Sequence, residues 1–178
     1  RLTNKWFLNH KSVNFEKIRI LYVGRIRVEK GIFSLLKILE KLDKDLSLSI
    51  VGAEKISNKT IIQKNVNVYE IETNEDNLIK FYDDHNIFVL PSYTEGHPMV
   101  LLEALARRRP VIIFKEIQHV IGNKKGIFVS ERNYQSFSET LNHIKNNYKK
   151  IQEEMEKNKL PTSKEFLDKF AKSILDSN

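Results

Sequence analysis

The sequence predicts an α/β fold, a Rossmann-like doubly wound parallel sheet. Short runs rich in Ile, Val and Leu alternate with longer helical patterns, which is typical of a parallel sheet with helices on both faces. The 178 residues are 40% hydrophobic and 30% charged, which suits one globular domain with a full core. The absence of cysteine excludes disulfide frameworks and thiolate metal sites, and fits a reducing compartment.

Each expected element follows from its own pattern. The longest helical pattern carries one apolar stripe and is otherwise charged, so we expect a solvated helix there. Gly52 is expected to end the second strand, and Pro161 to break the last long helix. The expected strands are 18–23, 46–51, 66–69, 87–90, 110–114 and 126–129; the expected helices are 32–42, 76–83 and 134–157; and the stripe is Phe137, Leu141, Ile144, Tyr148 and Ile151.

The chain begins without an initiator Met, and we expect it to be part of a longer polypeptide. Residues 1–16 are interpreted as a lead-in from a missing amino-terminal domain. Residues 17–160 form the predicted domain, and 161–178 a helical tail that starts a new amphipathic segment at Ser163.

The segment 92–109, SYTEGHPMVLLEALARRR, places two glutamates around the start of an otherwise apolar helix. Glu95 precedes Gly96 and Pro98, residue types that open helices at the cap and first turn, so its carboxylate is expected at the helix mouth. Glu103 lies within the apolar helix. Because an unpaired buried charge is costly, we expect hydroxyls or a cation to meet Glu103.

Two loops are expected at the carboxyl ends of strands, where doubly wound sheets bind their ligands. The first, 24–31, is bounded by glycines and carries three cations. Arg25 can fork onto phosphate oxygens, and Lys30 adds a point charge. The second, 93–99, leads into a helix start, whose free N–H groups attract anions. A diphosphate between the loops would leave the glutamates to bind hydroxyls.

Three segments carry a resemblance to a known family: LYVGRIRVEKG at 21–31, LSIVGAEK at 48–55 and FVLPSYTEGHPMVLLEALARRRPVI at 88–112. In the third, two glutamates separated by seven residues lie within Ser-x-x-Glu-Gly-x-Pro and Leu-Glu-Ala. Together the segments resemble the carboxyl-terminal, donor-binding domain of a GT-B glycosyltransferase of the retaining family 4, glycosyl transferases group 1. The resemblance covers residues 18–151 and implies that the predicted domain is one half of a GT-B fold.

The resemblance implies that the chain binds a nucleoside-diphosphate sugar and transfers the sugar, with retention, to an acceptor hydroxyl in polysaccharide or glycoconjugate synthesis. Arg25 and Lys30 would hold the diphosphate and stabilise its departing charge, Glu95 would face the sugar, and Glu103 would bind the ribose hydroxyls. No metal and no cofactor are implied. The implied donor-binding set is Gly24, Arg25, Lys30, Glu95, Gly96, His97, Pro98, Met99 and Glu103.

The sequence also departs from the family pattern. Val28 stands where relatives often have Pro, and Ala53 where a second glycine is common. The larger departure is the segment 115–119, where relatives usually have a Gly-Gly turn followed by a glutamate. Here Glu116 and His119 occupy that region without a glycine, so the resemblance does not extend to the contacts of this loop.

Two other functions stay open at this point: a nucleotide-sugar epimerase or hydrolase on a related fold, and a non-catalytic basic module that binds polyanions. The net charge of +7 invites phosphate-bearing partners, but the basic residues are scattered, and nucleic acid is not expected. No apolar run approaches the ~20 residues of a spanning helix. We expect a cytoplasmic protein, with peripheral contact at the inner membrane face left open. The base, sugar, acceptor and pathway are not specified.

The proposed site residues have structural interpretations as well. Glu103 could pair with a basic side chain in the core. Glu95, Arg25 and Lys30 could be ordinary surface charges. The run 107–109 most simply complements the negative end of the helix that it follows.

Overall fold

A parallel sheet forms the centre of the molecule in this computed structural model, which describes residues 2–11, 13, 15–42, 45–54 and 64–162. Within the described part, the sheet has six strands in the order β3-β2-β1-β4-β5-β6, and all neighbouring strands are parallel. The predicted α/β class is confirmed. The strands are β1 (Ile18–Val23), β2 (Leu46–Ala53), β3 (Val66–Glu70), β4 (Ile87–Leu90), β5 (Val111–Phe114) and β6 (Ile127–Ser130).

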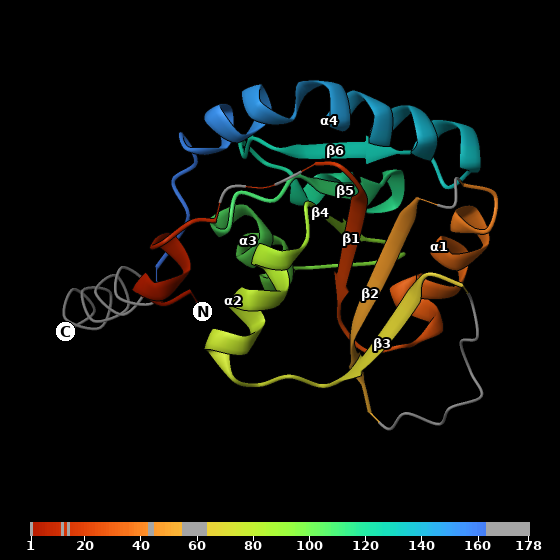
Figure 1. Cartoon of the computed structure of the whole chain (residues 1–178), viewed down its shortest axis with the longest axis horizontal. Coiled ribbons are helices and arrows are strands. Elements are labelled where there is room, and N and C mark those ends of the chain that lie inside the picture. Colours follow the sequence, from red (N-terminus) through yellow and green to blue (C-terminus); the bar gives the residue numbers. More distant parts are fainter. Residues whose placement is uncertain (1, 12, 14, 43–44, 55–63, 163–178) are drawn as a thin grey trace, which may run out of the picture.

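Helices cover both faces of the sheet, which makes it doubly wound. The helices α1 (Ile32–Leu39) and α4 (Tyr134–Met155) lie on one side, and α2 (Glu75–Asp84) and α3 (Met99–Ala106) lie on the other (Figure 1). Because β4 and β5 lie between these layers, every residue of both strands is buried. The short 3-10 helices are η1 (Asn4–Phe7), η2 (Val28–Lys30) and η3 (Lys115–Val120).

Most of the predicted elements are confirmed, and β1 and β4 have the predicted bounds. The stripe of α4 is buried as expected. The prediction that Gly52 ends the second strand is wrong, because β2 continues to Ala53 through a bulge. A Cβ on Gly52 would collide with the carbonyl oxygen of Gly24. The glycine therefore permits a close approach of two backbone segments rather than a turn.

Helix ends were predicted less well than strands. The helix predicted for 32–42 ends at Leu39, and the one predicted for 134–157 ends at Met155. Pro98 is the N-cap of α3 rather than part of its first turn. The tail from Ser163 onward lies outside the described residues.

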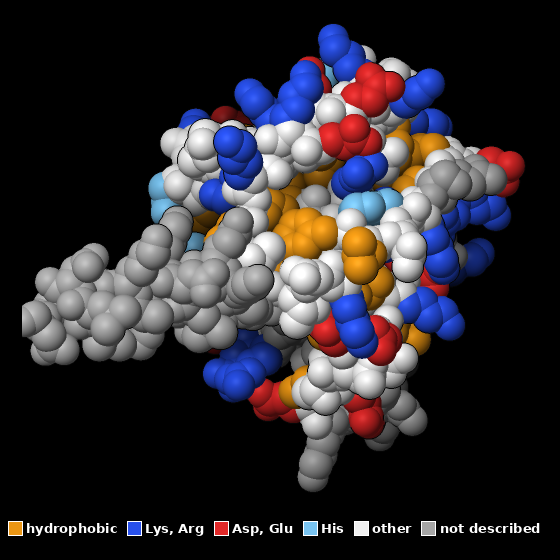
Figure 2. All heavy atoms as spheres, turned by 90° about the vertical axis from the view of Figure 1, so that its left-hand side faces the viewer, with side chains coloured by type: hydrophobic (Ala, Val, Ile, Leu, Met, Phe, Trp, Pro, Cys, Tyr) orange, Lys and Arg blue, Asp and Glu red, His pale blue; other side chains and the backbone are white. Residues whose placement is uncertain are grey.

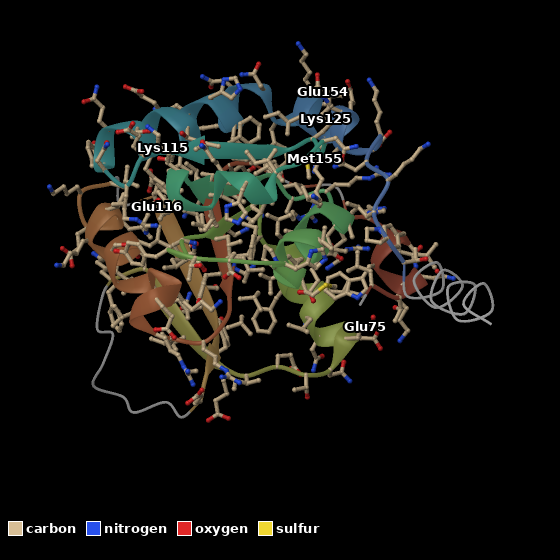
Figure 3. All side chains as sticks on the ribbon, turned by 180° about the vertical axis from the view of Figure 1, so that it is seen from behind. Glu75, Lys115, Glu116, Lys125, Glu154 and Met155 are labelled. Atoms are coloured by element: carbon tan, nitrogen blue, oxygen red, sulfur yellow. The ribbon has the colours of Figure 1, made fainter. Side chains whose placement is uncertain are left out.

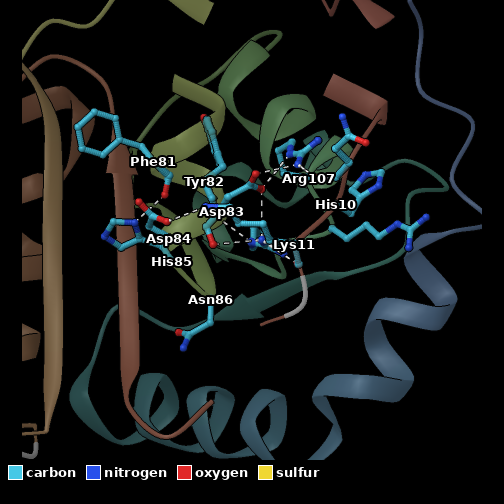
Figure 4. Close-up of polar contacts among 12 residues, drawn as sticks. His10, Lys11, Phe81, Tyr82, Asp83, Asp84, His85, Asn86 and Arg107 are labelled. Carbon is cyan, nitrogen blue, oxygen red and sulfur yellow. Dashed lines mark hydrogen bonds and ion pairs between the residues drawn. The ribbon is translucent and has the colours of Figure 1, made fainter. Parts of the chain in front are cut away.

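The interpretation of the run 107–109 is wrong for two of its three arginines. Arg107 and Arg109 are each 1% exposed and pair with Asp83 of α2, at 2.8 and 3.3 Å respectively. Figure 4 shows Arg107 beside Asp83. Arg108 instead contacts Glu156 near the end of α4. The buried pair also fastens the amino-terminal segment to the domain, because Arg107 donates hydrogen bonds to the carbonyl oxygens of Trp6, Leu8 and Asn9.

The order of the strands fixes where a ligand site can lie. Successive connections move outward in opposite directions from the adjacent strands β1 and β4. The connections that follow these two strands therefore run in opposite directions, which makes this point of the sheet the switch point where doubly wound sheets bind ligands. The loops predicted to bind a diphosphate are those that follow these two strands.

Candidate functional site

The loop after β1 begins tightly against the neighbouring strand. The N–H of Gly24 donates to the carbonyl oxygen of Val51 in β2, and the φ of Gly24 is +156°. The hydroxyl of Tyr22 donates to the carbonyl oxygen of Arg25 at 2.8 Å. The backbone of the loop is thus fixed at its start, while the side chain of Arg25 remains 60% exposed.

The loops after β1 and β4 meet through their backbones. The N–H of Tyr93 donates to the carbonyl oxygen of Glu29 at 3.0 Å. Gly31 has a φ of +68°, and a Cβ there would collide with the carbonyl oxygen of Pro91. A glycine at this position therefore allows both a left-handed backbone and the close contact between the loops.

Lys30 and Glu95 form an ion pair between these two loops. The Nζ of Lys30 lies 2.8 Å from Oε1 of Glu95, and the same oxygen accepts a 2.7 Å hydrogen bond from the hydroxyl of Ser92. The Lys30 side chain is 34% exposed and that of Glu95 is 12% exposed. The structure thus brings together, at the switch point, a residue predicted to bind phosphate and a residue predicted to face the sugar.

The start of α3 lies beside Glu95. Pro98 caps α3 without a side-chain hydrogen bond, and Gly96 and His97 are exposed in the turn before it. The Nε2 of His119, on η3, lies 2.8 Å from the carbonyl oxygen of Glu95. A pocket of about 210 Å³ lies between the start of α3 and η3, and Gly96, His97, Pro98 and His119 contribute to its lining.

Glu103 lies one turn into α3. Of the two kinds of partner expected for it, a hydroxyl or a cation, the structure shows a hydroxyl. Tyr82 of α2, which is fully buried, donates to Oε2 of Glu103 at 2.9 Å. Burial raises the pKa of the Glu103 carboxyl, and the hydrogen bond from Tyr82 opposes that rise. Glu103 therefore lies in an apolar setting in which a further hydroxyl donor would stabilise its charge.

Arg25 points toward Glu54, at the end of β2, rather than toward Glu95. The Nε of Arg25 lies 3.6 Å from Oε1 of Glu54, which also accepts from Arg27 at 3.2 Å. These side chains are about half exposed or more. Of the two predicted phosphate ligands, the structure brings only Lys30 into contact with Glu95.

Arg132, which lies just after β6 and contacts the loop after β4, was not predicted from the sequence. Its guanidinium donates to the carbonyl oxygens of Pro91 and Ser92, at 2.8 and 3.3 Å. It also contacts Glu116 of η3 and Ser34 of α1. No sequence motif marks Arg132, because its partners come from distant segments that only the fold brings together.

Two other features are absent from the described residues. Within that part of the chain, no cluster of three or more His, Asp or Glu side chains could hold a metal ion. Likewise, none of the helices within the described ranges is both long and apolar enough to cross a membrane.

The strand order and the connections define a Rossmann-like α/β domain, with a candidate ligand site at the switch point. Comparison with known families identifies the domain further. The chain belongs to the glycosyl transferases group 1 family, whose model matches residues 5–160. This confirms the family inferred from the three sequence segments.

Curated relatives agree with this family. The chain is 30% identical over 149 residues to the capsular polysaccharide biosynthesis glycosyltransferase CapM of Staphylococcus aureus, covering 77% of this chain and 39% of CapM. It is 31% identical over 137 residues to an uncharacterized glycosyltransferase of Haemophilus influenzae, covering 70% of this chain and 38% of that protein. The chain thus spans about two fifths of the length of these relatives.

Solved structures share the fold at lower identity. A sucrose-phosphate synthase from Thermosynechococcus elongatus superposes with a TM-score of 0.70 at 17% identity, covering 93% of this chain and 47% of the synthase. The C-terminal domain of the group 1 glycosyltransferase LpcC from Francisella tularensis gives 0.62 at 18% identity, covering 89% of this chain and 94% of that domain. Anabaena HepE, solved with UDP and glucose, gives 0.63 at 14% identity, covering 80% of this chain and 42% of HepE. The domain therefore has the fold of one half of a GT-B glycosyltransferase.

Proposed function

We propose that the chain is the donor-binding domain of a retaining glycosyltransferase, which binds a nucleoside-diphosphate sugar and transfers the sugar to an acceptor hydroxyl. The observation that carries this proposal is the Lys30–Glu95 ion pair, which lies between the two loops beside the start of α3. A cation, a helix start and a carboxylate close together suit a ligand that joins an anionic group to hydroxyls. HepE, solved with UDP and glucose, supports this ligand class.

The diphosphate would bind Lys30, Arg25 and the N–H groups at the start of α3. The Arg25–Glu54 ion pair is weak because both side chains are about 60% exposed, so a phosphate can displace Glu54. In the transfer, the bond between the anomeric carbon and the diphosphate oxygen breaks, and the electron pair leaves with the diphosphate. The same cations and helix start stabilise that charge as it develops. The acceptor oxygen forms a new bond to the anomeric carbon, and its hydroxyl proton passes to the released diphosphate.

The hydroxyls of the donor would bind the two glutamates. Glu95 is oriented by Ser92 and Lys30, and it would accept from the hydroxyls of the sugar. Glu103 would accept from the ribose hydroxyls in addition to Tyr82. No side chain is assigned as a nucleophile, and no metal is required.

The family match favours transfer over epimerisation or hydrolysis. The polyanion-binding alternative finds little support in the surface charge, because Lys and Arg side chains are interspersed with Asp and Glu on the face that Figure 2 shows. CapM, a capsular polysaccharide enzyme, supports a role in polysaccharide or glycoconjugate synthesis. The acceptor site would lie largely in the part of such enzymes that this chain does not match, so we expect little turnover by the chain alone.

Calorimetric titration of the chain with UDP, GDP and ADP at two salt concentrations tests the proposal. Saturable binding of one nucleotide that persists at the higher salt would support a donor site and identify the base. Binding of all three alike that disappears with added salt would indicate a nonspecific polyanion surface instead. The absence of binding at millimolar nucleotide would contradict the proposal for this chain.

A further inference from the structure

Arg132 makes hydrogen bonds to three segments close to the Lys30–Glu95 pair. Its Nη1 donates at 2.8 Å both to Oγ of Ser34 on α1 and to the carbonyl oxygen of Pro91 after β4. Its Nη2 donates to the carbonyl oxygen of Ser92, and its Nε to Oε1 of Glu116 at 2.8 Å. One guanidinium therefore joins the first helix, the loop after β4 and η3.

These contacts lead to both members of the ion pair. On one side, the hydroxyl of Ser34 donates in turn to the carbonyl oxygen of Gly31, the residue after Lys30, at 2.8 Å. On the other side, the hydroxyl of Ser92, whose carbonyl oxygen Arg132 holds, donates to the Glu95 carboxylate. Arg132 is thus the shared anchor of the two loops that carry the cation and the carboxylate.

The guanidinium plane is also fixed by two aromatic rings. Its Cζ lies 4.0 Å from the ring centroid of Tyr93 and 4.2 Å from that of Phe114. Such stacking and a fork of several donors are available to arginine and not to lysine. The Arg132 side chain is only 14% exposed, and Glu116, whose pKa the hydrogen bond from Arg132 lowers, supplies the balancing charge.

We propose that Arg132 is a positioning residue that holds the loops after β1 and β4 at the separation at which Lys30 and Glu95 engage a donor. We assign it no contact with the ligand, because it makes four hydrogen bonds to the protein and Glu116 balances its charge. The inference rests on the proposed function for the meaning of that separation.

Hydrogen exchange tests the positioning without any ligand. In Arg132→Ala and Arg132→Lys, the Tyr93 N–H, which bonds Glu29, is expected to exchange about 10-fold faster or more, because its loop loses its anchor. Lys115→Ala is the matched control, because it also removes one positive charge. Lys115 lies on η3, is 67% exposed and contacts Glu131 instead of the loops (Figure 3). Exchange at Tyr93 that matches the wild type in Arg132→Lys would overturn the inference.

Nucleotide titration then tests what the position is for. We expect both Arg132 variants to bind the preferred nucleotide about 10- to 100-fold more weakly, Lys115→Ala to bind like the wild type, and added guanidinium to restore part of the affinity of Arg132→Ala. Circular dichroism shows which variants are folded, and affinities are compared only among these. If Arg132→Ala unfolds, Arg132→Lys serves for the comparison. Full affinity in folded Arg132→Lys would overturn the inference. Failure of the wild type to bind any nucleotide would contradict the proposed function, while the exchange result still reports on the anchor.

Discussion

Replacing Asp83 with Asn should destabilise the fold by about 3–5 kcal/mol, the usual cost of breaking a buried ion pair by removing one partner. Asp83 is 6% exposed and is the carboxylate shared by Arg107 and Arg109, which are 1% exposed. Asparagine keeps the shape of the side chain, so no cavity contributes to the loss. Burial already lowers the pKa of Arg109, and Nη1 of Arg109 has no hydrogen-bond partner among the described residues. Without Asp83, two buried cations would lack their compensating charge.

Urea unfolding followed by tryptophan fluorescence measures this loss, because Trp6 is the sole tryptophan of the sequence and is 3% exposed. Asp84→Asn is the matched control, since Asp84 is 50% exposed and pairs with the similarly exposed Lys11 at 3.4 Å. Its removal should cost no more than about 1 kcal/mol. If Asp83→Asn were no more destabilising than the control, the argument that Asp83 balances both arginines would be refuted.

Four further predictions concern the site. Glu95→Ala should weaken binding of the sugar nucleotide more than binding of the bare diphosphate in calorimetry, and equal losses would argue against contact with the sugar. Glu103→Ala should weaken nucleotide binding by about 1–3 kcal/mol in a folded protein, and unchanged affinity would exclude the ribose role. Burial raises the pKa of Glu103 in the folded state above its usual 4.5, so its charge costs stability once the pH rises through that pKa. The free energy of unfolding of Glu103→Gln, measured in urea, should therefore increase relative to that of the wild type from acidic to neutral pH. A difference that stays constant with pH would contradict this. Glu54→Ala should tighten diphosphate binding by freeing Arg25, whereas weaker binding in calorimetry would mean that Glu54 helps to hold Arg25 in place.

The sequence predicted the sheet well because burial on both faces demands continuous apolar runs. The short apolar runs that form β4 and β5 have no polar face, which is typical of fully buried strands. Pro91 follows the first run, and Pro110 precedes the core of the second. Gly52 was misinterpreted because a glycine that ends a strand and one that permits a close approach look the same in sequence. The collision with Gly24 that explains it involves residues far apart in the chain.

The site could be predicted in part, for the same reason. Lys30 and Glu95 were predicted as ligands because each lies in a loop expected at a strand end, and parallel strands bring such loops to one edge. Arg132, Asp83 and Tyr82 were not predicted, since their roles depend on contacts over 21 to 98 residues of sequence separation. Charge alone did not distinguish the buried Arg107 from the exposed Arg25, because composition carries no information on which side chains the fold encloses.

The four charged groups proposed to bind the donor already have partners that a donor could replace or supplement. Arg25 contacts Glu54, Lys30 contacts Glu95, and Glu103 accepts from Tyr82. Donor affinity would then reflect the free energy of the interactions that the donor forms minus that of the ion pairs it displaces. The exposed partner of Arg25 costs little to displace, whereas the Lys30–Glu95 pair is only partly exposed, and its separation must suit a diphosphate and a sugar at once. Because both loops that set this separation converge on Arg132, changes there should affect donor binding more than changes at Glu54.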